Sequence, residues 1–200
     1  ETLNELRGRH DPRTSSRAVA IHVVTAVALR AQGKTAEALE RALKAKDQAG
    51  PLQLLFDAHR GWPLFTAVQI GITAMLAGDF RLALRSFTEA QLQTHPSRYR
   101  FLARDALVRS ALLHAAFGNT DEARRLLTRS ERMERSRCWV EETVDASHTM
   151  ASALVGDSPP EERLQQLLDL ELTQVGELWP YYVLAVSRLM HEVGRLDDLD

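Results

Sequence analysis

The chain has 200 residues, of which 44% are hydrophobic and 26% charged, with a formal net charge of -2 and one cysteine. This composition suits a globular chain with a buried core, and it excludes a mainly disordered protein and a scaffold built on internal disulfides. The near-neutral charge gives no general attraction to nucleic acid, no apolar run approaches the ~20 residues of a membrane span, and no secretory signal is visible, so we expect a cytoplasmic protein without membrane contact.

Two pairs of helices, each joined by a short turn, follow one another in the first half of the chain. Repeat one has an Ala/Val-rich helical stretch over residues 15–32, which stops at Gly33, and a second helical pattern over residues 35–43. Repeat two has its first helix over residues 62–77, with a proline in the first turn, where a helix does not use the missing N–H. That helix is predicted to end at Gly78.

The clearest helix start in the chain follows Gly78. Because glycine adopts positive φ without strain, Gly78 is predicted to end one helix and Asp79 to cap the next. Ala83, Phe87 and Ala90 recur at i, i+4 and i+7, which places them on one helical face. A single hairpin cannot bury its own apolar face, so neighbouring units are expected to stack.

Three further units are predicted in the second half. Their first helices cover residues 97–117, 139–155 and 178–193, and end at Gly118, Gly156 and Gly194. The second helix of repeat three starts near Thr120, and that of repeat four is predicted from Pro159 to about Leu172. Residues 1–9 read as the tail of an earlier helix and residues 194–200 as the opening of another turn and helix. Since the chain also begins without Met, we expect a fragment of a longer protein.

The turn glycines recur at a nearly constant spacing. They are Gly33, Gly78, Gly118, Gly156 and Gly194, separated by 45, 40, 38 and 38 residues. A small residue stands seven positions before each: Ala26, Gly71, Ala111, Thr149 and Ser187. Five positions after the glycine, repeats one to three carry Ala38, Ala83 and Ala123. This predicts an all-α fold, an α-solenoid of about five antiparallel helix pairs in one domain over 1–200, with repeats near 12–50, 51–95, 96–137, 138–175 and 176–200.

Repeat two resembles the tetratricopeptide repeat (TPR). The resemblance rests on the small residue Gly71 in the first helix, the Gly78-Asp79 turn, and the small–aromatic–small set Ala83, Phe87 and Ala90. The other repeats fit this pattern less well, and their period is nearer 40 residues than the usual 34. The resemblance therefore implies TPR-like helix pairs with a longer repeat.

The longer period resembles the helical-repeat region of large LuxR-type, MalT-like transcriptional regulators. The Ala/Arg/Leu-rich helix pairs carry this likeness, together with the phrases Gly176–Tyr182 and Gly194–Asp197. In such regulators an ATP-binding module precedes the repeats and a helix-turn-helix module follows them. The resemblance implies that this chain recognises an effector or a signal protein, while a domain absent from the fragment contacts DNA.

No motif for catalysis or for a cofactor is complete. Residues 28–35 satisfy a relaxed phosphate-loop pattern, but they begin inside a helix, and their Gly-Lys-Thr occupies the same turn as Gly78 and Gly118, so no nucleotide site is predicted. The seven histidines form no metal-binding motif, although His114 and His148 lie on neighbouring first helices and could approach each other. Cys138 reads as an inert thiol. We therefore expect no enzyme, no cofactor and no metal.

A basic stretch occupies the second helix of repeat three, and two readings of it compete. It contains Arg124, Arg125, Arg129, Arg132, Arg135 and Arg137. The arginines could bind an acidic partner or nucleic acid. However, Glu122, Glu131 and Glu134 are interleaved at spacings of three and four residues, which favours ion pairs on a solvated face.

The concave surface of the stack is the remaining candidate site, because first helices line it in proteins of this kind. By the resemblance, the distance from each turn glycine sets which positions of a first helix face inward. These positions are Val23, Val27, Phe65, Val68, Ile72, Met75, Asp105, Leu112, Met150, Tyr181, Leu184 and Arg188. The candidate ligand residues among them are Phe65, Ile72, Met75, Asp105, Tyr181 and Arg188. Since most of this surface is apolar, it could hold an apolar or peptide-like ligand, or pack against another domain or a second copy; a phase error of one position is the third alternative. Trp62 and Trp179 read as packing at helix starts.

Two functions follow from these observations. The first is a non-catalytic sensor and interaction module of a bacterial LuxR-type regulator, which binds a protein or small-molecule effector in the groove. The second is a general TPR-like scaffold that binds a peptide or protein partner or associates with itself.

Overall fold

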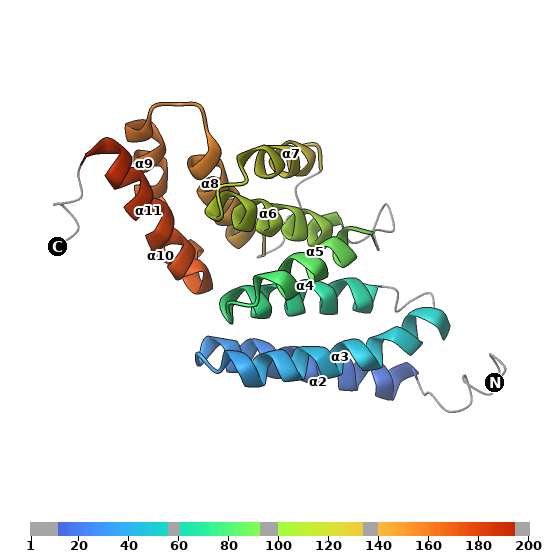
Figure 1. Ribbon diagram of the computed structural model, residues 1–200. Coiled ribbons are helices and arrows are strands. Elements are labelled where there is room, and N and C mark those ends of the chain that lie inside the picture. The colour runs from blue at the N-terminus through green and yellow to red at the C-terminus, as the bar shows by residue number, and fades with distance from the viewer. Residues whose placement is uncertain (1–11, 56–60, 93–99, 134–139, 195–200) are drawn as a thin grey trace. The chain divides into compact units, whose positions relative to one another are not determined.

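The computed structural model describes residues 12–55, 61–92, 100–133 and 140–194, and these form helices and no strands (Figure 1). The prediction of an all-helical chain is confirmed over these ranges. None of the helices found there is long and apolar enough to cross a membrane. The chain divides into two compact units, Glu1–Ala106 and Leu107–Asp200, and the boundary falls within helix α6 (Arg100–Ala116).

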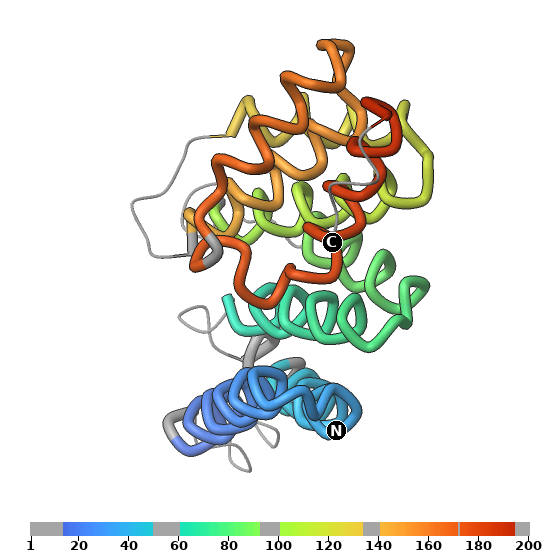
Figure 2. The backbone as a smooth tube through the Cα atoms, turned by 90° about the vertical axis from the view of Figure 1, so that its left-hand side faces the viewer, coloured from blue at the N-terminus to red at the C-terminus, as the bar shows by residue number. Residues whose placement is uncertain are grey.

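The first unit is a succession of helices, of which the first four contact their neighbours along the chain. It contains α2 (Pro12–Ala31), α3 (Thr35–Leu55), α4 (Gly61–Leu76), α5 (Phe80–Leu92) and the first part of α6. α2 and α3 lie side by side in both views (Figure 2), α3 packs on α4, and α4 packs on α5. A smaller contact joins α2 to α4. α3 continues past residue 50, where the sequence placed the end of repeat one.

Small and branched side chains form the core of this unit. One cluster joins Val19 and Val23 of α2 to Ala45 and Ala49 of α3, and the half-buried rings of Trp62 and Phe65 pack against it. These two rings meet edge to face, with centroids 6.1 Å apart. A second cluster contains Ala26, Ala42 and Ile70, with Leu39 and Leu82 at its margin. Trp62 therefore packs at the start of α4, as predicted.

The second unit contains the rest of α6 and a less regular succession of helices. These are α7 (Thr120–Glu131), α8 (Val140–Val155), α9 (Pro160–Leu168), α10 (Leu172–Val175), the 3₁₀ turn η2 (Gly176–Leu178) and α11 (Trp179–Val193). α8 contacts α7 and α9, α9 contacts α11, and α8 also touches α10 and α11.

The prediction that the second helix of repeat four runs to about Leu172 is wrong, because α9 ends at Leu168. The Leu170 N–H donates to the Leu167 carbonyl, which tightens and closes the last turn. A new helix start follows at once, since the Gln174 side chain reaches back and accepts from the Glu171 N–H, as the third residue of a helix does in a capping box. Local capping thus breaks the predicted helix in two.

Among the predicted turns that the structure describes on both sides of the glycine, three share one backbone design. Gly33, Gly78 and Gly118 have φ of 75°, 81° and 78°, in the left-handed region that glycine alone adopts without strain. In each turn the residue after the glycine donates its N–H to a carbonyl five positions back, from Lys34 to Leu29, Asp79 to Ala74 and Asn119 to His114. The glycine N–H donates three positions back. This is the Schellman motif, repeated three times.

The helix that follows each turn also starts in the same way. Ala38, Ala83 and Ala123 donate their N–H groups to the residue just after the turn glycine, and each is fully buried. At Gly78 the side chain contributes as predicted: Asp79 Oδ1 accepts from the Leu82 N–H at 3.0 Å.

Gly71, the small residue seven positions before the Gly78 turn, lies close to α5. A Cβ built on Gly71 would lie 2.4 Å from Cε1 of Phe87, so the ring of α5 fills the space that a side chain on α4 would occupy. Two residues of the TPR-like pattern, Gly71 and Phe87, are therefore in direct contact across the α4–α5 interface.

Candidate functional site

The three predicted groove residues of α4 lie in or against the core. Ile72 and Met75 expose 3% and 2% of their surface, and Phe65 is half-buried against the Val19 cluster. All three belong to the first unit, and in this structure they stabilise helix packing. A ligand-binding role for them stays a prediction.

The other three predicted site residues differ in exposure. Asp105 of α6 is buried in the first unit, at 2% exposed. Tyr181 and Arg188 lie two turns apart on α11, and the structure thus places them on one side of that helix. Tyr181 is buried, which raises the pKa of its hydroxyl well above the usual value because the phenolate would be poorly solvated. The Arg188 side chain is 40% exposed, and its Nε lies 3.5 Å from Glu192 Oε1.

The remaining inward positions also separate into core and surface. Val23, Val68, Leu112 and Met150 are buried, whereas Val27 and Leu184 are 39% and 45% exposed. Of the positions that the sequence assigned to the groove, solvent therefore reaches mainly Val27, Leu184 and Arg188.

Sequence reasoning missed a buried arginine on α6. The Arg109 side chain is 2% exposed, and its Nη1 lies 3.7 Å from Glu177 Oε1 in η2. A buried guanidinium requires compensating partners, and Glu177 supplies negative charge from an irregular segment between α10 and α11. The available signal was one arginine inside the apolar run of residues 106–113.

A second polar group joins two first helices within the first unit. Arg30 of α2 donates from Nη1 to Gln69 Oε1 at 3.1 Å and to Thr73 Oγ1 at 3.2 Å, both on α4. Thr73 in turn donates to the Gln69 carbonyl. The first helices of repeats one and two are thus connected by side-chain hydrogen bonds as well as by apolar contact.

Charged side chains on the described part of the basic helix α7 form ion pairs within the chain. Arg125 binds Glu122 through two hydrogen bonds of 2.7 and 2.6 Å, which lowers the pKa of the Glu122 carboxyl. Glu131 lies 3.3 Å from His148 Nε2 on α8. Arg135, Arg137 and Glu134 fall outside the described residues. The reading of a solvated face with ion pairs is supported for Arg125.

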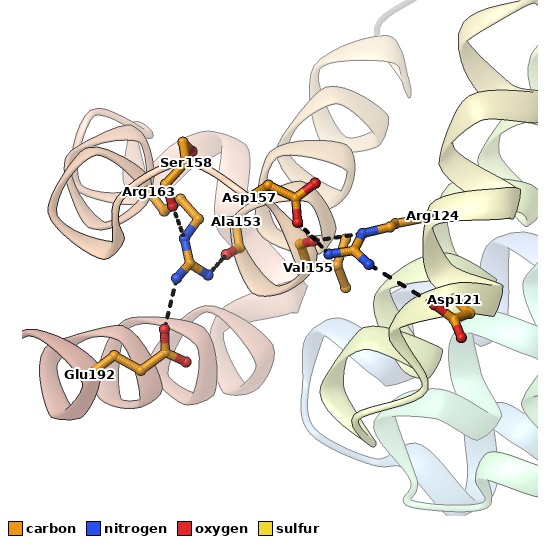
Figure 3. A network of polar contacts seen from close by, with 8 residues as sticks. All are labelled: Asp121, Arg124, Ala153, Val155, Asp157, Ser158, Arg163 and Glu192. Atoms are coloured by element: carbon orange, nitrogen blue, oxygen red, sulfur yellow. Dashed lines mark hydrogen bonds and ion pairs between the residues drawn. The ribbon is translucent and has the colours of Figure 1, made fainter.

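Arg124 contacts the end of the next helix (Figure 3). Its Nε donates to the Val155 carbonyl at 3.0 Å, and its Nη2 donates to Asp157 at 2.7 Å. It also lies 4.0 Å from Asp121. Arg124 therefore acts as a side-chain cap for the carbonyl end of α8.

Arg163 of α9 approaches the same turn (Figure 3). Its three nitrogens donate to the Ser158 carbonyl, the Ala153 carbonyl and the Glu192 carboxylate, at 2.9, 2.8 and 2.8 Å. The residue is 8% exposed. Its guanidinium thus joins the α8–α9 turn to α11, and its donors are used for structure.

The described part of the chain offers no metal-binding group of three or more His, Cys, Asp or Glu side chains. His114 contacts Asn119 at 3.3 Å, whereas His148 contacts Ser152 and Glu131. The phosphate-loop lookalike lies on the end of α2 and the Gly33 turn, with the same backbone hydrogen bonds as the turns at Gly78 and Gly118. Cys138 falls outside the described residues.

Exposed apolar side chains gather on two first helices. α2 exposes Ile21, Val24 and Val27, and α11 exposes Trp179, Val183 and Leu184. Trp179 stacks on Tyr182 with ring centroids 5.4 Å apart. The other large apolar side chains found exposed, Leu43, Leu92, Phe117 and Leu168, each lie on a different element or turn. Contiguous apolar patches of this kind mark interaction surfaces more often than scattered residues do.

Comparison of the chain with protein-family models, with curated proteins and with solved structures found no match.

Proposed function

We propose that the chain is a non-catalytic recognition module, built as an α-solenoid of TPR-like helix pairs, which binds a protein or a small-molecule effector. Two observations support the solenoid: α2 to α5 and α7 to α9 each contact the next helix along the chain, and three turns share one hydrogen-bond pattern. In such an architecture each pair buries its apolar face against the next, and the first helices present the binding surface.

The observation that carries the recognition role is the exposure of apolar residues on α2 and α11. Second helices of the described pairs mostly present charged residues to solvent, such as Glu40 and Lys44 on α3 or Arg125 on α7. The first helices α2 and α11 instead present branched and aromatic side chains. Because water solvates such surfaces poorly, a partner that covers them gains free energy from their burial.

The assignment to a bacterial LuxR-type regulator rests on the sequence resemblance alone. In that setting the module recognises the signal, and a separate domain contacts DNA. The full-length sequence tests this part directly: a phosphate loop upstream and a helix-turn-helix downstream support it, and the absence of both contradicts it.

A thermal-shift screen tests recognition. The wild-type chain is screened against small-molecule effectors and against a library of helical peptides, because a ligand that binds only the folded state raises the melting temperature, Tm. At 100 times its Kd a ligand adds about 2.7 kcal/mol, which corresponds to a rise of roughly 5 to 10 °C. A small-molecule hit supports a sensor, whereas hits among peptides alone support a scaffold.

Surface variants locate the binding. Val24→Glu on α2 and Val183→Glu on α11 are expected to abolish the shift for ligands that use those helices. Leu92→Glu at the end of α5 is the matched control, since Leu92 is 81% exposed and belongs to neither surface. If no ligand shifts Tm, or if neither α2 nor α11 variants alter any shift, the proposed recognition role is wrong.

A further inference from the structure

One side of α2 forms an uncovered apolar strip. Arg17, Ile21, Val24 and Ala28 follow one another at i, i+4, i+7 and i+11, and all are exposed, with Ile21 at 63% and Val24 at 67%. Val27, which is 39% exposed, lies beside them. We call Arg17, Ile21, Val24, Val27 and Ala28 the α2 surface.

The opposite side of α2 is already used for packing. Val19, Val23 and Ala26 are buried in the clusters that join α2 to α3 and α4. Between Ala18 and Leu29 the only titratable side chain is His22. A helix that is apolar on both sides is normally covered on both sides. The α2 surface therefore has the composition of a buried face and the exposure of a free one.

The charged side chains of α2 itself have one sign, although Glu37 and Asp47 of the neighbouring α3 are exposed. α2 carries arginines at positions 13, 17 and 30 and contains no Asp or Glu. Arg17 lies exposed at one end of the strip, and Lys34 lies exposed in the turn just beyond the other end. Arg30 is held by Gln69 and Thr73 on the α4 side. A complementary partner thus needs an apolar centre and negative charge at its ends.

We infer that the α2 surface docks an amphipathic helix of a partner protein, whose apolar stripe is bounded at both ends by Asp or Glu. This inference rests on the proposed recognition role and names the chemistry of its partner. The apolar stripe covers Ile21 and Val24, as helix-in-groove recognition requires, and the acidic ends meet Arg17 and Lys34.

A second copy of α2 is a poorer occupant. Antiparallel pairing of two α2 surfaces brings Arg17 of one chain to the Lys34 end of the other, and parallel pairing brings Arg17 to Arg17. Both arrangements place like charges together, which opposes symmetric association.

Two peptides test the inference on the full 200-residue chain. Both are 18-residue helical peptides with the same leucine stripe, and they differ only in their flanking residues, which are Glu in one and Lys in the other. Binding is measured by fluorescence anisotropy at low and moderate salt. We expect the Glu-flanked peptide to bind at least tenfold more tightly than the Lys-flanked peptide, and the difference to shrink as salt screens the flanking charges.

Variants of the chain identify the surface and the charges. Val24→Glu is expected to weaken binding of the Glu-flanked peptide at least tenfold, while Leu92→Glu, the same change at an exposed apolar residue of α5, leaves it unchanged. The double variant Arg17→Glu, Lys34→Glu is expected to reverse the preference in favour of the Lys-flanked peptide. Circular dichroism and the melting temperature verify that each variant folds.

The outcomes separate this inference from the proposed function. If both peptides bind equally and Val24→Glu removes both, recognition at α2 stands and the acidic partner is wrong. If neither peptide binds, the inference is overturned, while the thermal-shift screen decides the recognition role independently. If sedimentation shows that the wild-type chain dimerises and that Val24→Glu is monomeric, the occupant is a second copy and the inference is wrong.

Discussion

The turn at Gly78 joins α4 to α5, and the turn at Gly156 joins α8 to α9. The two turns are held together by different physical means. At Gly78 the backbone closes the turn by itself, through a left-handed glycine and hydrogen bonds that reach at most five residues. Gly156 is not left-handed, and the carbonyls at the end of α8 are bound by Arg124, from 31 residues earlier, and by Arg163 of the next helix. A Cβ on Gly156 would meet the Ser152 carbonyl oxygen at 2.9 Å.

The difference shows that a regular spacing of glycines does not imply one regular turn. The Gly78 turn depends on residues that are adjacent in sequence. The Gly156 turn depends on two arginines from other helices, so its stability is tied to the packing of α7, α9 and α11. Substitutions should therefore affect the two turns in different ways.

The largest effect is expected from Arg163→Met. This variant leaves the carbonyls of Ala153 and Ser158 and the Glu192 carboxylate without their donor, and we expect it to lower the free energy of unfolding by about 3 kcal/mol. Urea denaturation followed by circular dichroism measures the loss. Arg188→Met is the control: its half-exposed side chain lies 3.5 Å from the same carboxylate, and it should cost below about 0.5 kcal/mol. Equal losses would contradict the account of the Arg163 contacts.

The next largest losses of stability are expected from substitutions of the two turn glycines, and these substitutions distinguish the two turns. At Gly78, Ala is expected to cost about 1 to 2 kcal/mol because of its positive φ, and Asn less, because Asn tolerates the left-handed region. At Gly156 the order should reverse, because the obstacle is the space next to Ser152 and Arg163, and Asn is larger than Ala. The same urea experiment on the four variants checks this. An identical order at both sites would show that the two turns are equivalent.

Arg124→Gln should have a smaller effect, about 1 kcal/mol at low salt. It removes the hydrogen bond to the Val155 carbonyl and the pair with Asp157, but the Arg124 side chain is 46% exposed and partly compensated by water. The loss should decrease in 0.5 M salt, whereas the loss in Gly78→Ala should not, since backbone geometry is not screened. Stability measured at two salt concentrations decides this.

The smallest effect concerns the Glu122–Arg125 pair on α7, which takes no part in either turn. Because the folded state lowers the pKa of Glu122, the unfolded chain binds more protons near pH 4, and the pair contributes stability above the ordinary carboxyl pKa. That contribution is lost as pH falls through the lowered value. NMR titration of Arg125→Gln should show the pKa of Glu122 returning upward. An unchanged titration would mean that the pair does not form in solution.

Those parts of the fold that depend on neighbouring residues were predictable from the sequence. The left-handed turns at Gly33, Gly78 and Gly118 and the Asp79 cap follow from residues at short spacing, whereas the contact between Gly71 and Phe87 joins two helices and emerged from the structure. The break between α9 and α10 was missed because it depends on the side chain of Gln174 and on one tight turn inside a helical pattern.

The candidate site was less predictable, because a helix in the middle of a stack is apolar on more than one side. Ile72 and Met75 carry the same hydrophobic signal whether they face a groove or the core, and the structure places them in the core. Val24 has that signal too and is exposed, since the packing of α2 leaves its side uncovered. Arg109 and Glu177 are distant in sequence, so their proximity had no local signature.

The contacts between successive helices also affect how the chain acquires its structure. α2 meets α3 and α3 meets α4 without a long loop having to close first, so forming these contacts costs little chain entropy. Proteins dominated by such local contacts have low contact order and fold quickly. The α2–α3 contacts can therefore form early in folding, and the packing of α4 on α3 then adds the apolar burial that a single hairpin lacks.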